Sequence, residues 1–74
     1  MKLSKAIARE RTSQEKSLRD VARATGLSKM AVFNVERERS TLQTSLKVAK
    51  ALGIKGKRLM MLATYEVSLM VRAA

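Results

Sequence analysis

The sequence predicts an all-α fold. Three observations favour it: the 74 residues include no proline, only one phenylalanine and one tyrosine as aromatics, and few β-branched residues in the alternation typical of a strand. The length predicts one domain over residues 1–74, close to the smallest size that folds without metal or disulfides. Cysteine and histidine are both absent, so disulfides and the usual zinc sites are excluded, and helix packing must stabilise the fold.

The first helix is expected over residues 1–12, because Leu3, Ala6 and Ile7 recur at helical spacing. Residues 13–17 are polar and form the expected connection to a second helix. Further along the chain, leucines and alanines repeat on one side of a fourth helix that ends at Gly53.

The second and third helices form the central motif of the chain. They are expected over residues 18–25 and 29–37, with Ser17 and Asp20 as a capping box at the start of the second helix. Gly26 lies between them, where a sharp turn requires positive φ. This order of small, apolar and glycine residues is the pattern of a helix-turn-helix. Its expected core is Val21, Ala22, Gly26, Leu27, Val32 and Val35.

Charge gives the second clue, since 16 Lys and Arg against 6 Asp and Glu leave a formal net charge of +10. Such a charge favours a polyanion, above all nucleic acid, over a merely solvated basic surface. No stretch is long and apolar enough to span a bilayer and the start has no signal-peptide core, so we expect a cytoplasmic, nucleoid-associated protein. We expect that the chain is not an enzyme, because paired carboxylates and glycine-rich phosphate loops are missing. We also expect no metal, cofactor, small-molecule ligand or membrane partner.

The helix-turn-helix resembles that of the lambda-repressor/Cro (XRE-like) family of DNA-binding regulators. The likeness covers roughly residues 3–62 and implies a compact five-helix domain that places its third helix in the major groove of double-stranded DNA. It is carried by Val21-Ala22, Gly26-Leu27-Ser28, Val32, Val35-Glu36 and the later run Ala49-Lys50-Ala51-Leu52-Gly53-Ile54.

The resemblance assigns base reading to the outer side of the third helix, at Lys29, Met30, Phe33 and Asn34. Lys29 can donate to guanine and Asn34 can bond adenine, while Met30 and Phe33 offer apolar contact to thymine methyls. For Phe33, a place in the core or in a dimer interface stays open. The expected phosphate contacts are Ser28, Arg37, Arg39, Arg19 and Arg23.

Family members commonly pair an arginine at the place of Arg11 with a glutamate at the place of Glu36, which joins the first and third helices. We expect this structural clamp here, with a freely solvated Arg11 as the alternative. Several positions depart from the family pattern. Leu18 stands where glutamine is frequent, Glu10, Lys16 and Thr25 stand where apolar residues are usual, and Glu38 stands where glycine is frequent. The first helix is therefore expected to pack in a shifted register or on a thin core, and the third helix to run on by a residue.

Residues 64–74 are the expected dimerisation tail, because the chain beyond Ala63 carries more apolar surface than one small core absorbs. A helix is favoured for this tail, and a strand over residues 67–71 is the alternative. The expected interface residues are Tyr65, Val67, Leu69, Met70 and Val71.

Together these features predict a prokaryotic or phage transcription regulator, with repression as the expected activity, that reads a pseudo-palindromic operator as a homodimer. Two alternatives stay open. The first is an antitoxin, which uses the same DNA-binding fold but has a toxin protein as its main partner. The second is a non-specific nucleoid-type DNA binder, for which the net charge of +10 would suffice.

Overall fold

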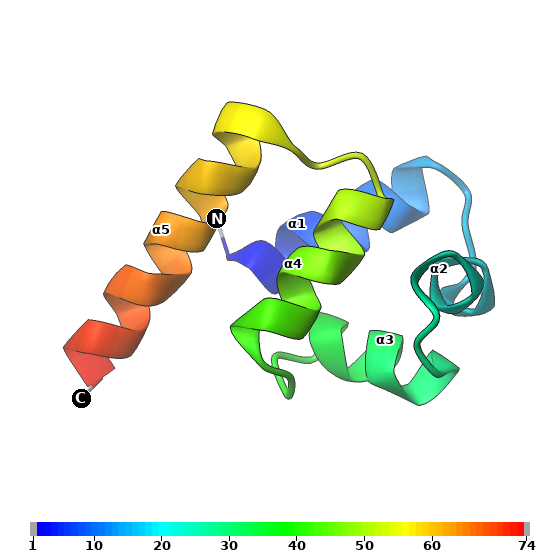
Figure 1. Cartoon of the computed structure of the whole chain (residues 1–74), viewed down its shortest axis with the longest axis horizontal. Coiled ribbons are helices and arrows are strands. Elements are labelled where there is room, and N and C mark those ends of the chain that lie inside the picture. Colours follow the sequence, from blue (N-terminus) through cyan, green and yellow to red (C-terminus); the bar gives the residue numbers. More distant parts are fainter. Residues whose placement is uncertain (1, 74) are drawn as a thin grey trace.

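The part of the chain that the structure describes folds into five helices (Figure 1). The computed structural model describes residues 2–73, without the side chains of residues 69, 70 and 73. Within residues 2–73 there is no strand, so the predicted all-α fold is confirmed and the alternative of a strand over residues 67–71 is wrong. The helices are α1 (Leu3–Ser13), α2 (Leu18–Thr25), α3 (Lys29–Glu36), α4 (Leu42–Ala51) and α5 (Gly56–Ala73).

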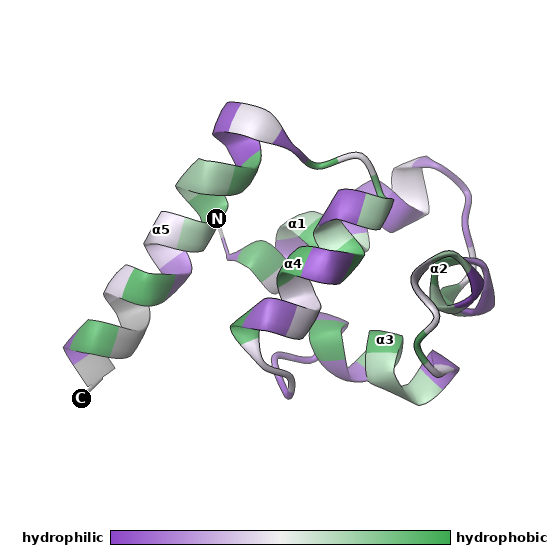
Figure 2. Ribbon diagram, in the orientation of Figure 1, coloured by the Kyte–Doolittle hydropathy of each residue, from purple (hydrophilic) through white to green (hydrophobic). Residues whose placement is uncertain are grey.

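The core lies where α1, α2, α3 and α4 meet, and apolar residues of α5 close one side of it (Figures 1 and 2). Leu3, Ala6 and Ile7 of α1 are buried, as their spacing predicts. Glu10 lies at the edge of this core, where its carboxylate accepts a hydrogen bond from Gln14 Nε2 at 3.2 Å. The largest fully buried side chains are Leu3, Ile7, Val21, Val32, Val35, Val48 and Ile54.

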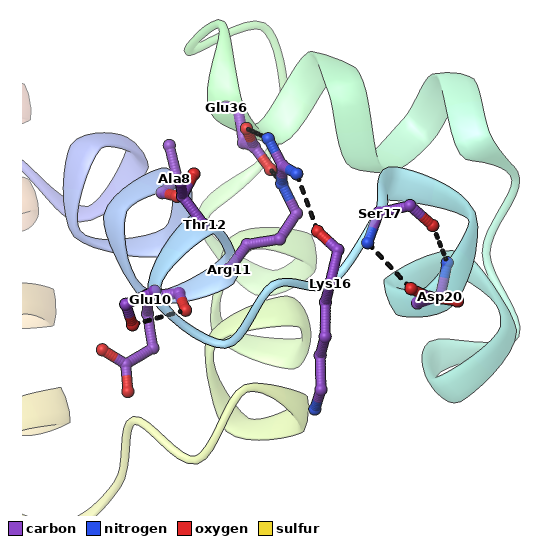
Figure 3. Close-up of polar contacts among 9 residues, drawn as sticks. Ala8, Glu10, Arg11, Thr12, Lys16, Ser17, Asp20 and Glu36 are labelled. Carbon is purple, nitrogen blue, oxygen red and sulfur yellow. Dashed lines mark hydrogen bonds and ion pairs between the residues drawn. The ribbon is translucent and has the colours of Figure 1, made fainter.

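α2 begins with the capping box that the sequence predicts (Figure 3). The backbone N–H of Asp20 donates to Ser17 Oγ at 3.0 Å, and the backbone N–H of Ser17 donates to Asp20 Oδ2 at 2.8 Å. The helix ends at Gly26, whose φ of +75° is a left-handed conformation that a side chain resists. Ser28 then caps α3 by accepting a hydrogen bond from the backbone N–H of Ala31 at 3.1 Å. Caps at both starts and glycine at the turn thus fix the helix-turn-helix.

The capping box predicts a pH-dependent contribution to stability. The hydrogen bond from the Ser17 backbone N–H, followed by the effect of the adjacent Ser17 hydroxyl, lowers the pKa of Asp20. Because the pKa is lower in the folded than in the unfolded chain, this stabilisation is present above the unfolded value of about 3.9 and is lost as pH falls through the folded value. Asp20→Asn should therefore unfold at a lower temperature than the wild type at pH 7, and the difference should shrink below about pH 4.

Thermal unfolding followed by circular dichroism between pH 2.5 and 8 measures this difference. Glu15→Gln is the control, because it removes the same charge at an exposed residue outside the capping box. The difference in unfolding temperature between Glu15→Gln and the wild type should be smaller and should change less with pH. An Asp20→Asn difference that does not change with pH would contradict the role of the carboxylate.

Glu38 lies two residues past the end of α3, and the prediction that this helix runs on by a residue is wrong. α3 stops at Glu36, and Glu38 adopts a φ of +60°, in the left-handed region where glycine is usual. Its carboxylate accepts a hydrogen bond from Ser4 Oγ at 3.0 Å and lies 3.4 Å from Lys2 Nζ. The Ser4 bond, followed by the charge of Lys2, lowers the pKa of Glu38. These contacts with the start of α1 offset the backbone strain, which is of the order of 1 kcal/mol.

The start of α1 is held by a hydrogen bond to α5, the last helix of the chain. Lys2, its N-cap residue, makes no side-chain capping bond, but the backbone N–H of Leu3 donates to Glu66 Oε1 of α5 at 2.8 Å. Around this contact, Leu62 is buried and Leu59 packs against the core. The C-terminal end of α5 leads away from the other helices (Figure 1). The observed α1 also differs from the prediction, since it begins at Leu3 and ends at Ser13 rather than at residue 12.

Candidate nucleic-acid interface

The outer side of α3 carries the four predicted base-reading residues. Val32 and Val35 point into the core, which leaves Lys29, Met30 and Phe33 exposed and Asn34 half-buried. Met30 is 63% exposed and Phe33 40% exposed, so the alternative that placed Phe33 in the core is wrong. α3 therefore presents hydrogen-bonding and apolar side chains together on one surface.

Two open grooves meet on this surface. The apolar groove, about 530 Å³, is lined by Leu18, Lys29, Met30 and Phe33. The basic groove, about 500 Å³, is lined by Arg11, Ser17, Leu18, Arg19 and Lys29. Leu18 and Lys29 belong to both grooves, so the two form one continuous surface across α2 and α3.

The guanidinium of Arg37 lies over the ring of Phe33. The Cζ atom of its guanidinium lies 5.5 Å from the centroid of the ring, within the range of a cation–π contact. Arg37 is exposed and follows directly after the last residue of α3. The contact places a positive charge next to the apolar groove.

Arg11 and Glu36 join α1 to α3 through two parallel hydrogen bonds (Figure 3). Arg11 Nε donates to Glu36 Oε2 at 2.6 Å, and Arg11 Nη2 donates to Glu36 Oε1 at 3.1 Å. A third bond, from Nη1 to the carbonyl oxygen of Lys16 at 2.9 Å, ties in the loop before α2. The side chains are 22% and 11% exposed, and the hydrogen bonds with Glu36 raise the pKa of Arg11. The structure thus brings these two predicted clamp residues together, and the pair sets the orientation of α3 on the domain.

Four exposed arginines are the candidate phosphate contacts. Arg19 lies in the basic groove, Arg37 follows α3, and Arg23 and Arg39 are exposed outside both grooves. Among the described residues, none of the four forms an ion pair. Ser28 lies at the start of α3, whose first turn has no acidic residue, so the free N–H groups there face no competing carboxylate.

The predicted dimerisation residues lie on α5. Tyr65, Val67 and Val71 are exposed, whereas the side chains of Leu69 and Met70 lie outside the described part of the chain. Met60 and Met61, which the sequence analysis did not assign to this surface, are exposed as well. None of the helices among the described residues is long and apolar enough to cross a membrane.

Comparison with protein families identifies the same helix-turn-helix motif. A family described as Helix-turn-helix matches residues 7–59, which span the clamp and both helices of the motif. The chain belongs to this XRE/lambda-repressor-like helix-turn-helix family. Members of the helix-turn-helix family are DNA-binding transcription regulators and typically not enzymes. Comparison with curated proteins and with solved structures gave no match.

Two residues of this helix-turn-helix domain took on roles that sequence reasoning missed. Leu18 was noted only as a departure from the family pattern and was assigned no role, yet it lines both grooves. The available signal was its place in the family pattern, since Leu18 stands at the start of α2 where glutamine is frequent. Glu66 was assigned no role in the sequence analysis, and its bond to Leu3 spans 63 residues. No local pattern in the sequence indicates such a contact.

Proposed function

We propose that the chain is a transcription repressor that reads a pseudo-palindromic operator as a homodimer, with α3 in the major groove. The observation that carries the proposal is the outer side of α3, where Lys29, Met30, Phe33 and Asn34 lie together. These side chains offer donors for guanine, a bidentate amide for adenine and apolar contact for thymine. Repression requires only that the operator be occupied.

Charge supports binding along the DNA backbone. Arg19 lines the basic groove and Arg37 lies against Phe33. Arg23 and Arg39 are exposed, and none of these four arginines forms an ion pair among the described residues. Contacts of this type position a protein on the duplex and release counterions, but they do not read sequence. The bases are read by α3.

The exposed side of α5 supports the homodimer. Met60, Val67 and Val71 are spaced by seven and four residues, so they lie along one stripe of the helix. Two copies of this stripe packed about a two-fold axis would remove it from water. A two-fold dimer presents its two reading helices to half-sites roughly 34 Å apart, one turn of the duplex.

Selection from a random duplex library at about physiological salt tests this function, because non-specific contacts are strongly weakened there. We expect a two-fold-symmetric consensus. Lys29→Ala and Asn34→Ala should each relax discrimination at one position of the half-site by about 1–3 kcal/mol, measured as the affinity ratio between consensus and single-base variants.

Lys50→Ala is the matched control, because Lys50 is exposed on α4 and belongs to neither groove. It should lower affinity for all duplexes to a similar extent and leave discrimination unchanged. If no consensus is recovered and the affinity falls steeply with salt, the specific regulator is refuted in favour of the nucleoid-type binder. If the chain forms a stable complex with a toxin protein through α5 in place of a homodimer, the antitoxin function replaces the proposed one.

A further inference from the structure

We propose that this chain selects thymines in its operator by their methyl groups, through the apolar groove of Leu18, Lys29, Met30 and Phe33. The inference rests on the proposed function and defines what the reading surface recognises. Hydrogen bonds from Lys29 and Asn34 then determine which bases are accepted at the neighbouring positions of the operator. The centre of the contact is apolar.

The composition of the groove favours an apolar ligand. Three of its four residues are Leu18, Met30 and Phe33, and the fourth, Lys29, has an aliphatic stem beneath its ammonium group. Met30 and Phe33 leave 63% and 40% of their surface in water. Covering such adjoining apolar side chains is favourable in proportion to the area removed from water.

The groove is also held in shape before any ligand arrives. The guanidinium of Arg37 lies over the Phe33 ring at 5.5 Å from its centroid. Leu18 is held in place because it packs against the core, and α2, to which it belongs, begins with the Ser17 capping box. Groups that are already ordered lose less side-chain entropy on binding, so the groove can discriminate among small apolar shapes.

Thymine is the base that fits this chemistry. In the major groove it alone among the four bases presents a methyl group, whereas the other edges present donors and acceptors. A donor or acceptor pressed against Leu18, Met30 and Phe33 would lose its water without gaining a hydrogen bond. The groove therefore favours thymine and also disfavours the other bases at the same position.

The basic groove supports a DNA strand as the occupant. The methyl carbon is attached to C5, beside C6 on the glycosidic side of the ring, so it lies toward the phosphates of its own strand. In this chain the apolar groove continues into the basic groove through Leu18 and Lys29, and there Arg19 has no ion pair among the described residues. A thymine methyl in the first groove thus directs its own backbone toward positive charge. An apolar segment of a protein would gain nothing from that charge.

Replacing thymine by uracil in the selected consensus duplex tests the proposal, since uracil lacks only the methyl group. Each thymine of one half-site is changed in turn, and the affinity is measured by fluorescence anisotropy at about physiological salt. At one or more positions we expect about fourfold weaker binding, which corresponds to the ~0.8 kcal/mol of one buried methylene-sized group.

Variants locate the contact. With Met30→Ala or Phe33→Ala, the ratio between thymine and uracil duplexes at those positions should fall toward one, because the groove no longer covers the methyl. Met61→Ala is the matched control, since Met61 is 66% exposed on α5, as exposed as Met30 but away from the groove. Its thymine-to-uracil ratio should equal that of the wild type.

The failures of the two proposals are distinguishable. If a two-fold consensus is bound but every uracil duplex binds as tightly as its thymine counterpart, or if the consensus half-site contains no thymine, methyl recognition is overturned while the regulator stands. Methyl recognition is also overturned if replacing thymine by uracil weakens binding to Met30→Ala and Phe33→Ala as much as it weakens binding to the wild type. If no consensus exists at all, the proposed function itself is overturned.

Discussion

Arg11→Met is expected to lower the free energy of unfolding by about 2–3 kcal/mol, one of the two largest effects predicted for this chain. The substitution leaves the Glu36 carboxylate without its two hydrogen-bond donors although its side chain is only 11% exposed. It also removes the donor to the carbonyl oxygen of Lys16. The expected value lies below the 3–5 kcal/mol typical of fully buried pairs, because the Arg11 side chain is still 22% exposed. Urea unfolding at pH 7 measures it.

Lys2→Met is the control, because it breaks the Lys2–Glu38 ion pair, whose side chains are 44% and 48% exposed. That exposed pair is screened by solvent and should contribute little to stability. The double substitution Arg11→Met with Glu36→Leu should recover part of the loss, because no uncompensated charge then stays at the interface between α1 and α3. A loss for Arg11→Met no larger than that for Lys2→Met would show that the clamp orients α3 without stabilising the domain.

Val71→Glu is expected to abolish the proposed dimer and to weaken binding to a two-fold operator by a factor of 100 or more. Val71 is 71% exposed in the single chain, so the fold has no need of it, but a carboxylate there would be buried in the two-fold contact along α5. The two half-sites would then be bound independently, and the gain from linking two binding events, typically 10²–10⁴, would be lost. Analytical ultracentrifugation and titration of full and half operators measure the two effects.

Lys50→Gln is the charge-matched control for this prediction, since it also lowers the net charge by one, at an exposed position of α4. It should stay dimeric. The thermal stability of Val71→Glu, measured at low protein concentration, separates a lost interface from a damaged fold. A Val71→Glu chain that remains dimeric and binds the full operator as well as Lys50→Gln does would refute the α5 interface.

Helical spacing, caps and the turn glycine predicted most of this fold, because these signals are local. Leu3, Ala6 and Ile7 are buried where their periodicity places them, and Ser17 with Asp20 starts α2 as the capping box requires. The meeting of Arg11 and Glu36, 25 residues apart, followed from the family resemblance and not from any local pattern. Such a pair becomes visible in one sequence only when its place in a known fold is recognised.

What the sequence did not predict depends on contacts between distant residues. Glu38 takes a conformation that usually belongs to glycine, and its carboxylate contacts Ser4 and Lys2 at the start of another helix. Leu18 was judged by the residue it replaces and not by its neighbours Met30 and Phe33, which reach it only after the chain turns at Gly26. In both cases the residue type gave the wrong expectation, because the tertiary contact outweighs the intrinsic preference.

The hydrogen bond between the Leu3 backbone N–H and Glu66 has a consequence for the DNA sequence itself. It joins the first turn of α1 to the middle of α5, so the direction in which α5 leaves the domain is tied to the body that carries α3. In the proposed dimer, that direction fixes the rotational phase between the two reading helices around the duplex. Half-sites displaced by five base pairs would face opposite sides of the DNA, since a full turn takes about 10–10.5 base pairs. The permitted length of the operator's central spacer is thus set in part by a contact between two residues that lie in neither groove of the reading surface.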